Sequence, residues 1–504
     1  MSCRVFSMKT ISTSLARMII AILCLAQFLY SQPDNCLKDI AVRSEKEKGQ
    51  SRFSSKRLKQ GANEKGDAAQ NRIIALVDCN VIDGTGKPLV KGQTIIIRGD
   101  RISAIGAKTP IPKEAMVVNL SGKTVIPGLI DMHGHLYANT KGLPMVSQFE
   151  AYSSLYLAGG VTSIRSPGEF DPEGAVAQRD RINNGEVRGP RMFISGPYFD
   201  NEPSNVPWIK GVRSPEEALQ LFNMWKNRID GVKFYMSITE PEFRAVLDAA
   251  HKHGLLATGH LDSISATRAI ELGIDGLEHG IFAMSELTQG TKGFDRFCAL
   301  ADLDLKSAKV KELVKKIVDK RVVIDPTIIT FQASLPDFEP VTPDFQKYFD
   351  QRVKQFYTES SNWAKTNIWE KNPKAAPCLH LALQHQLQFV KLVHDQGGII
   401  VAGTDPVSVK LIPGYSLHCE LRNLVEAGLT PIEAIKAATL DAATALRRQK
   451  DLGSIQTGKL ADLVVITGDP STQIEEVGKI ETVFKGGIQY NPASLRKAVE
   501  EGIK

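Results

Sequence analysis

Two histidines separated by one residue are the first candidates for chemistry in this chain. His133 and His135 follow a largely apolar run that starts at Val125. Side chains alternate between the two faces of a strand, so both imidazoles are expected on the same face. Two imidazoles at the end of a strand can bind one metal ion. A single His-x-His pair is common, and further ligands are needed to make a site.

Other apolar runs also carry a polar residue at or near their ends. They are Lys233 in 230–236, His260 in 255–260, His279 in 274–280 and Asp405 in 399–405. Taken singly, each histidine could be a hydrogen-bonded core residue. Together with the first pair, six such residues on five runs favour a shared metal site.

These runs belong to a repeating pattern of strands and helices. We expect strands at 124–136, 161–166, 191–197, 230–236, 255–260, 274–280, 322–329 and 399–405, with helices between them. The runs are continuously apolar, which is typical of parallel strands covered on both faces. The pattern predicts an α/β fold with a (β/α)8 barrel at 124–451, whose polar strand ends meet at one mouth.

The segments before and after the expected barrel have a different sequence pattern. Residues 72–123 and 452–495 contain short strand-like runs separated by glycine turns, so we expect one small antiparallel β-sandwich domain built from both segments. An aromatic-rich insertion at 330–377 follows the seventh expected strand and is a lid candidate.

The N-terminus has the features of an export signal. Residues 1–31 join positive charge to an apolar segment too short to span a membrane, and the charged stretch 32–71 is expected to be a disordered linker. We therefore expect a cleaved signal and a periplasmic or secreted protein without a transmembrane span after cleavage; the alternative is an uncleaved N-terminal anchor. Seven scattered cysteines exclude a disulfide scaffold, and one unassigned bridge remains open.

The net charge of +6 does not indicate a nucleic-acid partner. Residues 1–72 hold 13 Lys and Arg against 6 Asp and Glu, whereas the remainder holds 49 against 50. The expected folded part is therefore almost neutral, and we expect no nucleic-acid binding.

Lys233 is unusual among the candidate residues because an ammonium group cannot bind a metal and is costly to bury. Reaction of its amine with CO2 would give a carbamate whose two oxygens could bridge two metals. The alternative is a lysine that pairs with Glu278 or Asp405.

Several motifs resemble the amidohydrolase superfamily over about residues 72–490. They are the Pro-Gly-Leu-Ile-Asp-x-His-x-His run, Lys233, His260, Leu277-Glu-His279, Val401-Ala-Gly-Thr-Asp405, and the block around Gly458-Lys-Leu-Ala-Asp462. The chain is most similar to the imidazolonepropionase-related branch, which includes metal-dependent, prolidase-like dipeptidases.

The resemblance implies two divalent ions, with zinc expected from the imidazole and carboxylate ligands. It implies that His133, His135 and Asp405 bind one ion, that His260 and His279 bind the other, and that carboxylated Lys233 bridges them. A bridging hydroxide would attack the substrate carbonyl, and Asp405 would transfer its proton to the leaving amine.

Three residues are candidates for substrate contacts. Arg165 could bind a carboxylate or form a structural ion pair, and it is followed by Ser166 where many relatives have an acidic residue. Tyr235 could donate to the oxyanion or simply pack, and His418 could touch substrate or support the site.

The expected function is hydrolysis of a C–N bond in a small molecule or short peptide such as an Xaa-Pro dipeptide. The alternatives are a one-metal cyclic amide hydrolase of the imidazolonepropionase type, a deaminase or a lactonase. A non-catalytic binding protein on a retained barrel is the alternative from another class. Homo-oligomers are common among such barrels, so a homo-oligomer is also open.

Overall fold

The computed structural model describes residues 72–502 apart from 141–142, 205–208, 289, 292–293, 336–337, 339–344, 350, 352, 356–373 and 408–409. The expected signal at 1–31, the linker at 32–71 and much of the insertion at 330–377 lie outside the described residues.

Short parallel strands with helices between them form the main body of the protein. Met132 N–H donates to Ala402 O at 2.9 Å, and Asp230 N–H donates to Ile194 O at 2.7 Å, which joins two separately paired groups of strands. The expected (β/α)8 barrel is confirmed. Its first two strands are β6 (Leu129–Asp131) and β9 (Val161–Ser166), and its third is divided into β10 (Arg191–Ile194) and β11 (Tyr198–Phe199). The other five are β12 (Gly231–Phe234), β13 (Leu256–Gly259), β14 (Gly276–Glu278), β15 (Val323–Asp325) and β16 (Ile399–Ile400).

The barrel strands are held by apolar packing against the surrounding helices. Every residue of β9 and of β12 is buried, as expected for strands covered on both faces. Phe234 of β12 packs on Phe243 of α8, with ring centroids 4.2 Å apart. Helices lie between the barrel strands as expected, among them α7 (Pro215–Trp225), α8 (Glu240–Lys252), α9 (Ala266–Leu272) and α12 (Ala308–Asp319).

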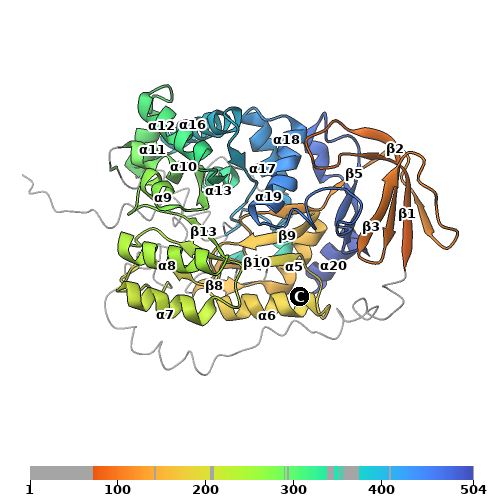
Figure 1. Cartoon of the computed structure of the whole chain (residues 1–504), viewed down its shortest axis with the longest axis horizontal. Helices are drawn as coiled ribbons and strands as arrows, with labels where there is room; N and C mark the ends of the chain where they lie inside the picture. Colours follow the sequence, from red (N-terminus) through yellow and green to blue (C-terminus); the bar gives the residue numbers. More distant parts are fainter. Residues whose placement is uncertain are drawn as a thin grey trace, which may run out of the picture.

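Segments from both ends of the described chain form a separate sheet (Figure 1). The sheet order is β19-β18-β17-β5-β1-β2-β3, with β4 paired to β1. The expectation of a purely antiparallel unit was wrong, because β1 runs parallel to β4 and β5. The strands are β1 (Ile73–Val81), β2 (Val90–Arg98), β3 (Arg101–Gly106), β4 (Met116–Asn119), β5 (Lys123–Pro127), β17 (Leu463–Thr467), β18 (Ile480–Lys485) and β19 (Ile488–Tyr490).

The run 124–136, expected to be one strand, is divided between the two sheets. Gly128 N–H donates to Asp462 O at 2.8 Å in the small domain, whereas Leu129 N–H donates to Gly160 O at 3.0 Å in the barrel. A Cβ on Gly128 would lie 2.2 Å from Thr162 Oγ1. The chain therefore changes sheets at a residue where only glycine fits without movement of its neighbours.

A disulfide joins Cys298 of α11 (Phe294–Ala301) to Cys378 of α16 (Ala375–Asp395). Helix α20 (Pro492–Gly502) packs against α5 (Phe149–Ala158). It extends beyond residue 495, where the small domain was expected to end. Within the described part of the chain, every helix is too short or too polar to cross a membrane.

Candidate metal centre

The polar residues expected at the barrel mouth lie at the ends of neighbouring strands. His133 and His135 follow β6, His260 follows β13, His279 follows β14 and Asp405 follows β16. Each of these five residues is at most 5% exposed. The parallel barrel thus brings together residues that are up to 272 positions apart in sequence.

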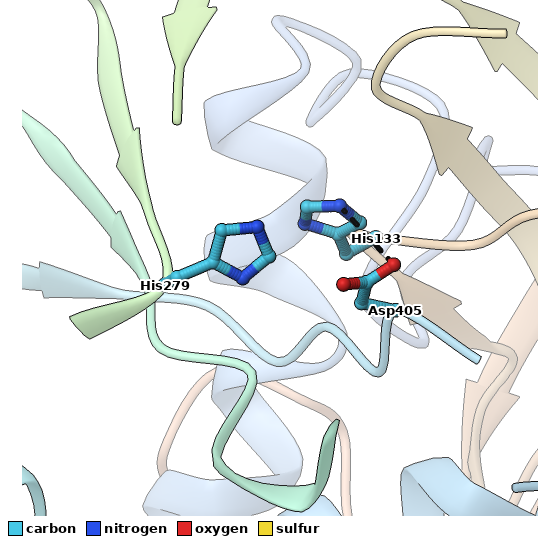
Figure 2. A group of neighbouring side chains, drawn as sticks. All are labelled: His133, His279 and Asp405. Atoms are coloured by element: carbon cyan, nitrogen blue, oxygen red, sulfur yellow. Dashed lines mark ion pairs between the residues drawn. The ribbon is translucent and has the colours of Figure 1, made fainter. Parts of the chain in front are cut away.

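The Asp405 carboxylate is close to both histidines of the His-x-His pair. Asp405 Oδ1 lies 3.4 Å from His135 Nε2 and 3.8 Å from His133 Nε2. One ligand atom from each of His133, His279 and Asp405 can be chosen so that all lie within 4.8 Å of one another. Figure 2 shows these three side chains directed toward one another from three parts of the barrel. The three groups are therefore close enough to belong to one metal centre, whether it holds one cation or two neighbouring cations.

His260 extends the cluster on its other side. Its ring centroid lies 4.5 Å from that of His279, and the residue is fully buried. Both His260 nitrogens lack a hydrogen-bond partner among the described residues. Buried polar atoms are normally paired, because an unpaired one costs about 1–3 kcal/mol. The nitrogens of His260 therefore fit a group from outside the chain, such as a metal ion.

The protonation states of the cluster also suit metal binding. Burial lowers the pKa of His133, His260 and His279 well below 6.5, and neighbouring positive charges lower it further. Burial acts to raise the pKa of Asp405, but the His135 hydrogen bond and the nearby histidines outweigh it and lower that pKa overall. Neutral imidazoles and an ionised carboxylate are the forms that bind cations.

Two of the expected ligands have left-handed backbones. His279 has φ 59° and Asp405 has φ 44°, a region that residues other than glycine seldom occupy. Such strain is concentrated at functional sites, where the surrounding structure holds it in place. The backbone geometry is therefore consistent with a site built for chemistry.

Lys233 lies in β12 with 1% of its surface exposed and its Nζ in contact with Glu278. Burial, followed by the charge of Arg165, lowers the pKa of Lys233 well below its usual value. A neutral amine is the form of lysine that reacts with CO2. Pairing with Glu278, the alternative considered from the sequence, is the arrangement seen for the unmodified side chain.

Comparisons with known proteins identify the family of the chain. A model of the amidohydrolase family matches residues 124–489. The chain belongs to the amidohydrolase family. The resemblance expected from the sequence is thereby confirmed.

Individual relatives of this amidohydrolase differ in how much they share with it. An imidazolonepropionase of Geobacillus kaustophilus is 42% identical over 89 residues, which are 17% of this chain and 19% of that enzyme, well under two thirds of its length. An ochratoxinase of Aspergillus niger is 24% identical over 471 residues, 81% of this chain and 84% of that protein. The crystal structure of a Xaa-Pro dipeptidase with bound methionine is 23% identical, covers 83% of this chain and 100% of its own, and has a TM-score of 0.63. That likeness supports the fold.

The three expected substrate contacts occupy different places in the amidohydrolase barrel. Arg165 is buried in ion pairs with Glu278 at 3.0 Å and Asp325 at 3.1 Å, as in the structural alternative. Tyr235 is partly buried, and its ring centroid is 5.0 Å from that of His260. His418 lies near the opposite end of the barrel, where its Nε2 is 2.8 Å from Gly159 O just before β9. The structure thus brings only Tyr235 to the mouth as an available group.

Two buried carboxyl groups of the barrel, one of them beside a proposed ligand, were not identified from the sequence. Asp325 ends β15, and its Oδ2 lies 3.4 Å from His133 Nδ1. Its position at the end of an apolar run was the same signal that identified Asp405. Glu169, three residues beyond Ser166, is buried against the Ser166 hydroxyl, and burial raises its pKa to about 8. No strand-end pattern marks Glu169, because it lies in a loop.

Proposed function

We propose that this amidohydrolase is an exported, metal-dependent enzyme that cleaves the C–N bond of a small amide, such as an Xaa-Pro-like dipeptide. The observation that carries the proposal is the convergence of buried imidazoles with Asp405, including His260 with two unpaired ring nitrogens. We propose His133, His135 and Asp405 as ligands of one cation, His260 and His279 as ligands of a second, and carboxylated Lys233 as their bridge. Zinc suits this set of ligands.

Bound cations would supply an activated water and polarise the substrate carbonyl. The chain's own groups complete the reaction. The ionised Asp405 would accept a proton from the attacking water and deliver it to the leaving amine. The Tyr235 hydroxyl would donate a hydrogen bond to the carbonyl oxygen as charge develops on it. The left-handed backbone at Asp405 would keep its carboxylate directed at His133 and His135.

Two features support export. The charged and apolar segments of residues 1–31 have the order of a signal sequence. The Cys298–Cys378 disulfide suits an oxidising compartment.

The test combines metal counting with a substrate screen. Purified protein would be loaded with zinc in bicarbonate buffer, and elemental analysis is expected to find two ions per chain. Dipeptides, N-acyl amino acids and lactones would then be screened, and cleavage of an amide substrate that a chelator abolishes is the expected result. One ion per chain would favour a mononuclear cyclic amide hydrolase, deaminase or lactonase. A chelator-insensitive protein that is inert on all substrates would favour a binding function.

Variants of the proposed machinery provide the second part of the test. Asp405→Ala and Lys233→Ala are expected to abolish turnover while the circular dichroism spectrum is retained. A short carboxylic acid such as acetate should partly restore Lys233→Ala if this position contributes a carboxylate. A variant that keeps most of the wild-type kcat would contradict the proposed mechanism.

A further inference from the structure

Thr327 has an unusual position next to the candidate metal centre. It precedes helix α13 (Ile328–Gln332), has φ 44° and is fully buried. A threonine at this position normally uses its hydroxyl to accept an N–H of the first helical turn. Here it makes no such bond, and its Oγ1 instead lies 2.7 Å from His279 Nδ1. The hydroxyl has been diverted from the helix to a proposed metal ligand.

A carboxylate from a distant helix takes over the diverted role. Glu420 of α17 (Tyr415–Glu426) is fully buried. Its Oε1 accepts the Ile328 N–H at 2.9 Å, and its Oε2 accepts the Ile329 N–H at 2.8 Å. These are the first two N–H groups of α13, which would otherwise be buried without an acceptor from their own helix.

We infer that Glu420 is a positioning residue for His279 and acts through Thr327. The inference rests on the proposed function, because it takes His279 to be a metal ligand. Glu420 pairs the N–H groups that follow Thr327 and so holds the strained Thr327 backbone, leaving the Thr327 hydroxyl available. The hydroxyl accepts the His279 Nδ1–H, which leaves the lone pair of Nε2 for the cation. The hydrogen bond on one imidazole nitrogen thereby selects the nitrogen that binds metal.

A second hydrogen-bonded link between α13 and α17 holds Glu420 in place. Asn423 Nδ2 donates to Gln332 Oε1 at 2.8 Å and lies 3.5 Å from Glu420 Oε2. This second link joins the end of α13 to the same face of α17. Helix α17 therefore supports α13 at both ends, although neither Glu420 nor Asn423 touches a proposed ligand in any contact described.

The experiment measures zinc affinity by competition with a chromophoric chelator on the full chain, alongside urea unfolding of the metal-free protein. Glu420→Gln keeps the size of the side chain but removes one of two N–H acceptors. Thr327→Val keeps the shape but removes the hydroxyl. Both variants are expected to lower the affinity for one of the two zinc ions by about 10- to 100-fold. Thr327→Ser, which retains the hydroxyl, should bind zinc nearly as well as the wild type.

A matched control removes a similar cap elsewhere. Glu433 completes a capping box with Thr430 at α18 (Pro431–Ala437), so Glu433→Ala, which removes the acceptor of the Thr430 N–H, should lower stability but not zinc affinity. The double variant Glu420→Gln/Thr327→Val should bind zinc no more weakly than Thr327→Val, since both changes act through one hydrogen bond. Additive losses, or wild-type affinity in both single variants, would overturn the inference alone. A wild-type protein that binds no zinc would overturn the proposed function instead.

Discussion

Buried charges beneath the candidate metal centre are linked through a single guanidinium. Arg165 donates to Met132 O, to Thr258 Oγ1 and to the carboxylates of Glu278 and Asp325. Glu278 contacts Lys233, and Asp325 lies beside His133, so Arg165 connects two proposed ligands by way of their carboxylate neighbours. With this many protein partners, the guanidinium is better suited to hold the site together than to bind substrate.

Replacing Arg165 is therefore expected to destabilise the protein. Arg165→Met would leave Glu278 and Asp325 buried with fewer compensating partners, which costs about 3–5 kcal/mol for a buried pair. Urea unfolding of the metal-free protein would measure the loss. Arg181→Met, which removes a half-exposed pair with Glu150, should cost less than about 1 kcal/mol. Unchanged stability with a raised KM would instead support binding of a substrate carboxylate.

His418 makes a separate contribution that depends on pH. Burial lowers its pKa from 6.5 to about 4, while its bond to Gly159 O partly opposes that shift. The unfolded chain therefore binds a proton more readily than the folded one. The stability from neutral His418 is fully present above about pH 6.5 and is lost as pH falls toward 4.

The variant His418→Asn retains a donor for Gly159 O but does not titrate. Its unfolding free energy in metal-free buffer should fall less steeply than that of the wild type between pH 6.5 and pH 4. The difference between the two proteins should reach no more than about 3 kcal/mol, because the ring is only partly buried. Parallel curves would show that His418 is free to protonate in the folded protein.

At the scale of elements, the alternating pattern of apolar runs was sufficient to predict the barrel and its mouth. A buried strand must be apolar along its length, so a histidine or aspartate at its end is conspicuous in sequence, as at His260 and Asp405. The junction at Gly128 was not predictable in this way, because β5 and β6 are both apolar and nothing in one sequence says which sheet each joins. Likewise, Glu420 and Thr327 are 93 positions apart, and only the packing of α17 on α13 connects them.

Adding a single methyl group at Gly128, in the β5–β6 junction, should destabilise the protein. Gly128→Ala would place a Cβ 2.2 Å from Thr162 Oγ1 and 2.6 Å from Thr162 Cγ2. Overpacking of this kind costs about 1–3 kcal/mol, which urea unfolding would detect. Thr162→Ala removes the two closest atoms and leaves only Thr162 Cβ, at 2.9 Å, so the double variant should be less destabilised than the sum of the single variants. A fully additive result would mean that the collision is relieved by movement of another segment.

At the scale of the whole molecule, long-range links hold segments that are distant in sequence. Strand β17 pairs antiparallel with β5, which directly precedes the first barrel strand, so a C-terminal segment is hydrogen-bonded to the segment that leads into the barrel. The Cys298–Cys378 disulfide encloses the insertion that begins near residue 330, with a sequence separation of 80. Such a cross-link limits the unfolded chain and typically contributes about 2–4 kcal/mol. It joins α11 and α16, both of which lie outside the cluster of proposed ligands.

Removal of this disulfide should consequently lower stability without emptying the metal centre. The free energy of unfolding of the double variant Cys298→Ala/Cys378→Ala is expected to be about 2–4 kcal/mol lower than that of the wild type, so it should unfold at a lower urea concentration. It should still bind the same number of zinc ions per chain. Cys79→Ala is the control, because Cys79 is buried and makes no disulfide. Thiol titration of the denatured wild type is expected to count two more thiol groups after reduction than before it. Equal stability of the oxidised wild type and the double variant would show that the cross-link does not restrain the unfolded chain. A loss of bound zinc in the double variant would show that α11 and α16 position the ligands.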